Sequence, residues 1–486
     1  MRYHYYVVLF LAIIFTIAGT RIQAQQTNAG DGYFSVGTQF NTNLSGFDSE
    51  LPFWLHANKL GIYDQRSANS LLYTEFQQPL VNGDRLSLQT SGRLMGRAAE
   101  ESTLGIHTLS ATLNYRFVRF RAGKFEDPIG MNYHPLSSGS MMYSRNTEPV
   151  PKLALHTDGF VDLPLTRGHL QFSSYISHGW FEDSRYVKNS YLHQKYLYLK
   201  INYKMLEVIG GIIHNVQWGG LHPERGQQPS SFSDFWHVLL AKGADQDSNA
   251  PRGEVSNALG NSVAAYDFNL RISLDRYRLT FYRLFYLEDK VSTRFRSPWD
   301  GMWGGGIVRK AEHPLVKALL YEHLNTKRQD AFDFEPRGTA SYYNNSFYPS
   351  GWTYKNRVLG NPLLLTDGSN YRPIYNNIVV AHHLGGRGFI TPHIEWKAFY
   401  TYSRNYGTVG DQIIETLPPP RQHTTYGKYR PLEELKKVNH SIYLGSSVSF
   451  PGYEHLQLRA GLAVDVGQLY ATDRLGLSIG AEYNIY

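Results

Sequence analysis

Residues Leu456 to Val466 alternate strictly between two kinds of side chain, and this pattern constrains the fold more than any other feature of the sequence. One face of the segment is apolar, while the other is small, polar or charged and includes Arg459 and Asp465. A period of two is typical of a β-strand with one dry face. The segment has eleven residues, which a tilted strand needs to cross a membrane, whereas strands of soluble proteins usually have about five or six. The apolar face consists of Leu456, Leu458, Ala460, Leu462, Val464 and Val466.

The same alternation recurs along the chain. It is clear in residues 475–485 and 441–450, and Pro451-Gly452 then supplies a turn. The opposing faces are rich in Gly, Ser and charged residues, which suits a watery lumen better than a second dry core. The sequence therefore predicts an all-β fold, a large transmembrane antiparallel β-barrel, with a secreted β-sandwich or propeller as the alternative. Weaker alternation occurs in residues 85–93, 108–117, 195–204, 269–275 and 276–285.

The composition agrees with a barrel. The 486 residues have a mean hydropathy of −0.39, as in a soluble protein, yet they include 36 Tyr, 25 Phe and 8 Trp. Only every second residue of a barrel strand faces lipid, so the mean hydropathy stays low. Tyr and Trp suit the two membrane interfaces. The chain has no cysteine, which excludes thiolate catalysis and Cys-based metal sites.

Residues 1–24 are predicted to be a cleaved export signal. Arg2 gives the positive start, Tyr5 to Ala18 is apolar except for Thr16, and Ala24 places a small residue at the cut. A membrane anchor helix is the alternative, but the apolar run is shorter than the roughly 20 residues that span a bilayer. The predicted barrel then comprises residues 25–486.

Two segments depart from the strand pattern. Ser233 to Lys242 is predicted to form a short helix, an insert near residues 232–243, with Ser233 as the N-cap and Gly243 at the end. Pro314 to Lys327 could be helix or strand. Helices in a barrel sequence are expected to be plugs or caps on the periplasmic mouth.

The sequence offers no set of residues that indicates catalysis or a cofactor. It lacks G-x-S-x-G, H-E-x-x-H and Walker motifs. His382 and His383 could bind a metal, but adjacent residues of a strand point to opposite faces. We therefore expect no enzyme activity, no cofactor and no metal. The net charge of +7 is spread along the chain without a run of Lys or Arg, so we expect no nucleic-acid partner.

Several stretches resemble the Wzi family of capsule assembly proteins, in the form common in Bacteroidetes. They include L-P-F-W-L-H-A-N-K-L-G, L-S-S-G-S-M-M-Y-S-R-N-T-E-P-V-P-K and S-G-W-T-Y. Each string is short, but their order and spread extend from about residue 33 to the end. The stretches are Leu51 to Gly61, Leu136 to Lys152, Gly253 to Phe268, Leu320 to Gln329 and Tyr342 to Pro362.

The resemblance implies an outer-membrane barrel of about 18 strands with short helical plug or periplasmic elements. Enterobacterial members of this family are lectins that hold capsular polysaccharide on the cell surface. We therefore expect a non-enzymatic protein that binds capsular or exopolysaccharide, contacts outer-membrane lipid and acts as a monomer. A channel or porin for small solutes is the alternative.

Sugars can be bound by aromatic faces together with planar polar groups. Tryptophans in Gly-rich, loop-like sequence are candidates for stacking on sugars, with nearby Arg and Lys for acidic sugars. The alternative for any one Trp, and the more common case in barrels, is an anchor at the lipid interface or the packing of a plug. The candidate binding residues are Trp218, Arg225, Trp299, Trp303, Trp352, Lys355 and Arg357.

A second group is predicted to be structural. Ser138 to Asn146, which includes Arg145, is expected to order a loop in the lumen. Glu322 is expected to point inward and to pair with a lumen Arg.

Overall fold

The structure is a computed structural model that describes residues 32–46, 49–131, 134–256, 258–288, 292–331, 340–416 and 427–485. Residues 1–24, for which an export signal is predicted, lie outside the described residues. No helix in the described ranges is long and apolar enough to cross a membrane.

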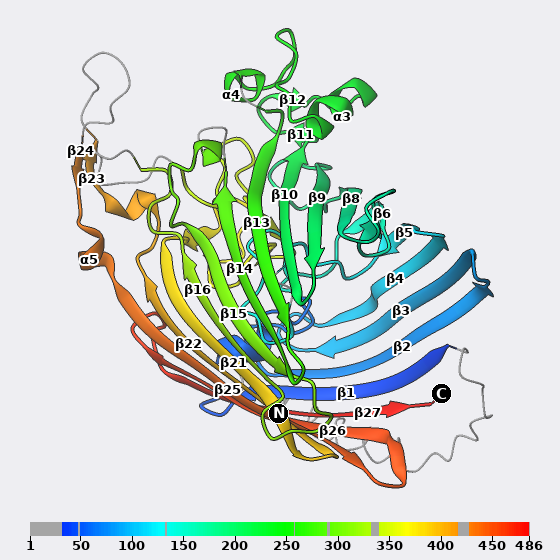
Figure 1. The fold of residues 1–486 in the computed structure, drawn as a ribbon. Helices are drawn as coiled ribbons and strands as arrows, with labels where there is room; N and C mark the ends of the chain where they lie inside the picture. Colours follow the sequence, from blue (N-terminus) through cyan, green and yellow to red (C-terminus); the bar gives the residue numbers. More distant parts are fainter. Residues whose placement is uncertain are drawn as a thin grey trace.

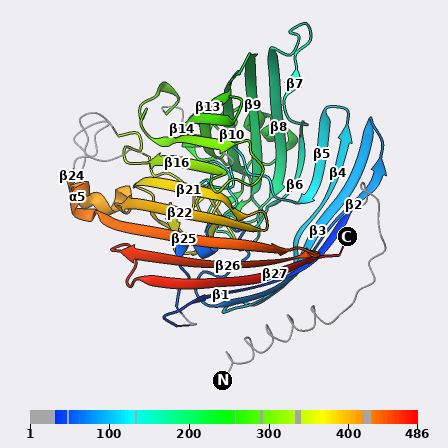
Figure 2. The same cartoon turned by 60° about the horizontal axis from the view of Figure 1, so that its bottom comes forward.

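Eighteen antiparallel strands form a closed barrel in the described part of the chain (Figure 1). The barrel closes where β1 pairs with both β2 and β27, with Phe40 opposite Ile479. Figure 2 shows β27 lying between β26 and β1. The predicted fold class and strand number are confirmed. The strands are β1 (Tyr33–Asn43), β2 (Asn69–Asn82), β3 (Leu86–Ala98), β4 (Thr103–Tyr115), β5 (Val118–Lys124), β6 (Pro151–Thr157), β8 (Leu170–Trp180), β9 (Tyr191–Tyr203), β10 (Leu206–Trp218), β13 (Asn261–Ser273), β14 (Tyr277–Leu287), β15 (Gly301–Arg309), β16 (Ala318–Asn325), β21 (Val379–Thr391), β22 (Ile394–Asn405), β25 (Lys437–Phe450), β26 (Tyr453–Gly467) and β27 (Arg474–Asn484).

The alternation in the sequence separates the two faces of the barrel wall. In β26, Leu462 and Val466 are 47% and 45% exposed on the outside, whereas Ala463 and Asp465 are 1% exposed on the inside. The outer face forms an apolar band, as a transmembrane barrel requires. Strands of 11 to 15 residues at β25 to β27 agree with the strands predicted there.

The undecided segment Pro314 to Lys327 contains a strand, β16 (Ala318–Asn325), and not a helix. Leu320 and Leu324 point into the core, while Leu319 and Tyr321 are exposed on the outer wall. This is a period of two. The neighbouring strands β15 and β21 supply the backbone partners on both sides, so the sheet decides the conformation of a segment whose local preference is ambiguous.

The two ends of the barrel differ in the length of their connections. The start of β1 and the end of β27 lie at the end with the short turns, such as residues 83–85, 204–205 and 451–452. The other end carries long loops, among them residues 44–68, 125–150, 219–260 and 326–378. We call these the short-turn end and the long-loop end.

The remaining elements are short and most lie in the long loops. The helical ones are α2 (Phe53–His56), α3 (Phe232–Leu239), α4 (Arg252–Ser256), η1 (Ser292–Arg294), η2 (Val409–Gln412) and α5 (Leu432–Leu435). The short strands are β7 (Val161–Asp162), β11 (Leu221–His222), β12 (Gly226–Gln227), β17 (Thr353–Tyr354), β18 (Arg357–Val358), β19 (Leu365–Thr366), β20 (Ile374–Asn376), β23 (Ile413–Thr416) and β24 (Gly427–Tyr429).

Two of the helices have different places relative to the wall. Helix α2 lies inside the lumen, where the Phe53 amide donates to Asp465 and Trp54 Nε1 donates to Thr401. Helix α3 begins earlier than predicted, because Ser231 and not Ser233 is the N-cap and forms a capping box with Asp234. It lies against the outer wall near the long-loop end. This place differs from the expected ones, which were a plug in the lumen or a cap on the periplasmic mouth.

Candidate functional site

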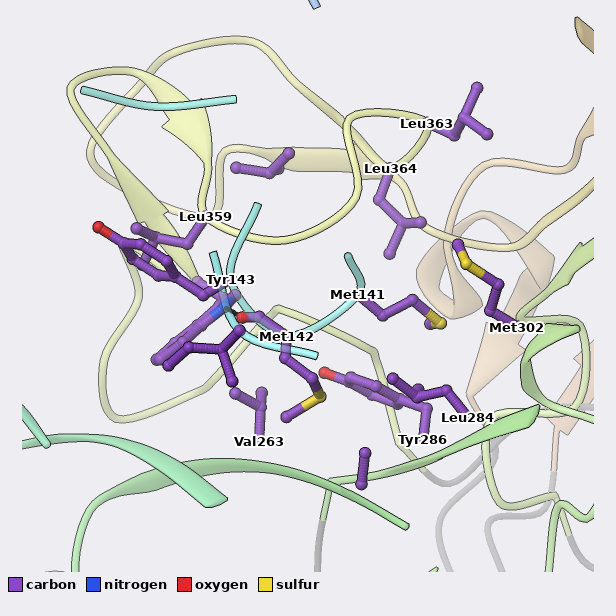
Figure 3. Packing of buried hydrophobic residues seen from close by; sticks show 14 of the residues in the cluster. Met141, Met142, Tyr143, Val263, Leu284, Tyr286, Met302, Leu359, Leu363 and Leu364 are labelled. Atoms are coloured by element: carbon purple, nitrogen blue, oxygen red, sulfur yellow. Dashed lines mark hydrogen bonds between the residues drawn. The ribbon is translucent and has the colours of Figure 1, made fainter. Parts of the chain in front are cut away.

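Three long loops fold into the lumen and fill it. We call the described parts of residues 44–68, 125–150 and 340–378 the plug. Figure 3 shows Met141 and Met142 lying between the loop residues Leu359 and Leu364 and the barrel wall. All four of these side chains are 0% exposed. A buried apolar core inside the barrel is the opposite of a water-filled channel.

Glu322 holds the plug to the barrel wall. It points inward from β16, and its carboxylate accepts hydrogen bonds from Ser137 Oγ at 2.6 Å, from Ser138 N at 2.7 Å and from Ser138 Oγ at 2.6 Å. Tyr282 Oη on β14 is a fourth donor. The predicted pairing with a lumen Arg is wrong for the described residues, because hydroxyl and amide donors surround the carboxylate instead.

The segment from Ser138 to Asn146 orders the plug internally. Asn146 Nδ2 donates to the Val358 carbonyl at 3.1 Å, and so joins two loops that are far apart in sequence. Arg145 makes an ion pair with Glu126, with Nη2 and Oε2 3.0 Å apart. Ser138 and Asn146 are 1% and 5% exposed. These contacts agree with the structural role expected for this segment.

A lumen cavity of about 520 Å³ remains on the short-turn side of the plug. Plug residues and the inner faces of β1, β3, β22 and β25 to β27 line it. Five Lys and Arg side chains line it, and Glu395 is the acid in the lining. The cations are Lys59, Arg93, Arg145, Lys397 and Arg459. The arginines are paired with acids in the wall or plug. The cavity can hold water and small anions but ends against the packed plug.

Three of the candidate binding residues are buried. Trp218 is 2% exposed beneath α3, and Trp352 is 0% exposed in the plug, where its Nε1 donates to the Met142 carbonyl at 3.0 Å. Arg357 donates to the Tyr63 carbonyl at 2.5 Å, also in the plug. Protein covers the faces of these three side chains in this structure, which places them in packing contacts, and their contact with a polysaccharide stays a prediction.

Trp299 and Trp303 lie on the outside of the barrel. Their rings stack with centroids 6.2 Å apart, and they are 65% and 38% exposed. Trp303 points away from the lumen because its neighbour on β15, Met302, is buried in the plug core. Arg283 packs over the Trp303 ring at 4.4 Å. An outward aromatic pair at a strand end matches the interfacial aromatic belt of barrels.

The remaining candidates, Arg225 and Lys355, are exposed in loops at the long-loop end. Lys355 lies in the turn between β17 and β18 and has a positive φ of 49°. Arg225 lies over the Phe347 ring at 5.7 Å, which joins the loop after β10 to the plug loop. These two side chains keep the access to solvent that a surface binding site needs.

The structure brings a second group of side chains together at this end, which the sequence did not reveal, with Tyr371 and Arg372 exposed and Tyr186 half-buried. Tyr186 and Tyr371 have ring centroids 5.1 Å apart, and Arg372 lies over Tyr371 at 5.6 Å. Asn370 Nδ2 donates to the Ser184 carbonyl at 3.0 Å and so joins the two loops. The run D-G-S-N-Y-R-P in residues 367–373 combines turn residues with an aromatic and a cation, a signal that could have found half of the pair. We call Tyr186, Tyr371, Arg372 and Arg225 the rim patch.

A groove of about 1350 Å³ runs from the outer wall to the loops at the same end. Its lower part is lined by the outward residues Leu197 and Ile212, and its upper part by polar side chains that include Asn344, Arg372 and Asp411. The arrangement can bind an elongated polar ligand by stacking, hydrogen bonds and charge. The described residues also contain two sets of possible metal ligands.

The first of these sets is the His pair. His382 faces outward and contacts Tyr321, while His383 faces inward and contacts Thr401, as the strand geometry predicts. The second set is Asp234, His237 and Asp245, whose ligand atoms lie within 4.8 Å of one another. One Asp234 oxygen already accepts the capping bonds of Ser231, so Asp234 is part of the α3 N-cap.

Glu254 in α4 is a buried carboxyl group in the loop of residues 219–260. Its side chain is 8% exposed and accepts the Gly260 amide at 2.9 Å. Burial raises the pKa of Glu254 to about 7. A raised carboxyl pKa stabilises the loop fully below the unfolded pKa of about 4.5, and this stability is lost as the pH rises through about 7.

We therefore expect proteolysis within residues 219–260 to be faster at about pH 8 than at about pH 6. Glu254→Gln should remove this difference, because the amide cannot ionise. The control is Asp247→Asn in the same loop, an exposed acid that should leave the pH dependence unchanged. Identical proteolysis rates at both pH values in the wild type would contradict the prediction.

Taken together, a closed barrel with an apolar outer band and a packed plug in the lumen is typical of an outer-membrane protein. Residues 57–368 match the family model of the capsule assembly protein Wzi. This match covers more than half of the chain, so the chain belongs to the Wzi capsule assembly family. Outer-membrane barrels have short turns on the periplasmic side and long loops on the extracellular side, so the short-turn end faces the periplasm and the long-loop end faces the outside.

A solved structure supports this fold. The structure of Wzi from Escherichia coli, described as an outer membrane protein involved in group 1 capsule assembly and as a carbohydrate-binding β-barrel, is 16% identical, with a TM-score of 0.54. The match covers 92% of this chain and 83% of that one. OccK5 of Pseudomonas aeruginosa is 9% identical with a TM-score of 0.46, over 93% and 98% of the two chains. No curated protein matches the sequence.

Proposed function

We propose that this protein binds capsular or other exported polysaccharide at its extracellular end and holds it on the cell surface without chemical turnover. Its outer band contacts membrane lipid, and the barrel acts as a monomer. The observation that carries the proposal is the combination of a packed lumen with exposed aromatic and cationic side chains at the extracellular end. A ligand of such a barrel is bound on the surface rather than carried through.

The rim patch has the chemistry for this ligand. The rings of Tyr186 and Tyr371 present flat apolar faces that can stack on the C–H faces of sugars. Arg372 and Arg225 carry planar guanidinium groups, which form two parallel hydrogen bonds with a carboxylate and suit acidic sugars. The description of Escherichia coli Wzi as carbohydrate-binding supports the same class of ligand. A channel for small solutes fits less well, because the plug core closes the lumen.

The first experiment is deletion of the gene, followed by separate measurement of cell-bound and shed polysaccharide. We expect unchanged total polymer with most of it released into the medium, because attachment and not synthesis is lost. Normal retention would contradict attachment, and conductance of the purified barrel in a planar bilayer would then decide whether it is a channel.

The second experiment locates the binding surface. Stacking on an aromatic ring contributes about 0.5 to 1.5 kcal/mol and an exposed charge pair about 0.2 to 1 kcal/mol, so the double variant Tyr371→Ala, Arg372→Gln should weaken polysaccharide binding by roughly tenfold. The matched control is Tyr115→Ala, Arg116→Gln at the periplasmic end, where Arg116 also lies over the Tyr ring at 5.6 Å. Binding is measured with purified polysaccharide and the folded protein. Equal losses in both double variants would show that the rim patch is not the site.

A further inference from the structure

Helix α3 covers polar side chains on a part of the barrel wall that faces lipid elsewhere. Phe235 packs against His193 with ring centroids 5.5 Å apart and against His178 at 6.1 Å. Both histidines point outward, because Leu192 and Ser177 beside them on the strands are buried inside the barrel. His193 is 0% exposed, so α3 shields this part of the wall, and Figure 1 shows the helix near the upper ends of β9 and β10.

The residues that follow His193 along β9 show where the apolar, lipid-facing band begins. Lys195 also faces outward, and its Nζ donates to the Val238 carbonyl in the last turn of α3 at 2.8 Å. The next outward residues, Leu197, Leu199 and Ile201, are 48%, 48% and 54% exposed and belong to the apolar band. An outward Lys in hydrocarbon is destabilising, most strongly at the midplane and less toward the interface. Helix α3 therefore covers the polar outward residues that lie just above the apolar band.

The opposite face of α3 is apolar and exposed, and the ring contacts of its aromatic residues lie within the helix itself. Phe232, Trp236 and Leu240 are 76%, 46% and 57% exposed. They are spaced by four residues, so they form one stripe along the helix and its C-cap. The stripe is continuous with the outer wall, because Leu240 lines the same groove as Leu197 and Ile212.

We propose that this stripe lies in the outer leaflet of the outer membrane, so that α3 is an interfacial helix that completes the apolar band over β8 to β10. Phe and Trp on one face of a short amphipathic helix are the side chains that bury at the boundary between headgroups and acyl chains. The occupant of the stripe is lipid, because the surface that adjoins it is the lipid-facing wall. This placement holds the extracellular loop of residues 219–260 at the membrane surface, and it does not depend on what that loop binds.

The absence of cysteine from the chain allows single spin labels to measure depth. The full-length protein is reconstituted in vesicles of phosphatidylethanolamine and phosphatidylglycerol, with a nitroxide at Phe232→Cys or Trp236→Cys. Leu199→Cys in the apolar band is the lipid reference, and Arg225→Cys in the extracellular loop is the water reference. Relaxation by oxygen and by a water-soluble nickel chelate reports the depth of each label.

We expect both helix labels to shift toward oxygen and away from nickel, as at Leu199→Cys. A nickel response equal to that of Arg225→Cys would overturn the proposal, because the stripe would then face water. Spin–spin broadening between labels would also overturn it, since a second copy of the chain would cover the stripe. An independent check uses wild type and Trp236→Phe: quenching of tryptophan fluorescence by lipids brominated on their acyl chains should fall in the variant, and equal quenching would contradict the placement.

Discussion

Replacement of Glu322 by Leu is expected to destabilise the barrel by about 3 to 5 kcal/mol, because several buried donors lose their charged acceptor at once. The variant leaves the Ser138 amide and the hydroxyl groups of Ser137, Ser138 and Tyr282 without their acceptor. A buried donor without a partner costs about 1 to 3 kcal/mol. The hydroxyl groups can turn to other acceptors, and the variant also removes the desolvation cost of the carboxylate, so the loss is smaller than four full penalties.

The same variant tests whether the plug is held by this residue. Because Glu322 connects the wall strands β14 and β16 to the loop of residues 125–150, its loss should also loosen the plug. We expect a lower urea midpoint in detergent and current fluctuations in a planar bilayer that the wild type lacks. Glu312→Leu in an exposed periplasmic turn is the control and should change neither. An unchanged midpoint for Glu322→Leu would mean that the plug is held by its apolar core alone.

Replacement of Trp352 by Ala is expected to cost about 3 to 5 kcal/mol, the usual range for truncating a buried aromatic side chain. Trp352 is 0% exposed, and its Nε1 bond to the Met142 carbonyl joins two plug loops. The variant leaves a cavity that the surrounding loops fill only in part, and it leaves the carbonyl without its donor.

Trp299→Ala is the matched control for Trp352→Ala. Trp299 is 65% exposed on the outer wall, and in detergent we expect its truncation to change stability by about 0.5 kcal/mol or less, as for most surface sites. Unfolding midpoints measure both effects. If Trp352→Ala instead kept its stability and lost only polysaccharide affinity, the buried position would be wrong and the side chain would be a binding platform after all.

The candidate site was predictable only in part. Arg225 remains exposed at the extracellular end, as a binding residue must, and the helix near residue 232 could be recognised from its pattern. The sequence could not assign the candidate tryptophans to a plug, an interfacial belt or a binding loop, because all three kinds of site can have a Gly-rich sequence around the Trp. Tyr186 and Tyr371 are 185 positions apart in sequence, and only the folding of their loops brings the rings to 5.1 Å.

Glu322 shows why partners inside the lumen escape prediction. Its inward direction follows from the period of two in β16, a local property of the backbone. Its partners depend on which loop enters the barrel at that height, and the plug brings two serines there instead of an arginine. The place of α3 is a similar case, since the amphipathic pattern indicates a helix but does not indicate on which side of the wall it packs.

The sequence by itself determined the membrane-spanning strands, the faces they present and the class of fold, because strand alternation is a local signal that lipid outside and polar groups inside impose on every strand. The tertiary structure alone decided the filled lumen, the burial of Trp218, Trp352 and Arg357, the rim patch and the outer position of α3. These features depend on contacts between loops far apart in the chain, and no periodic pattern in the sequence records which loop meets which wall.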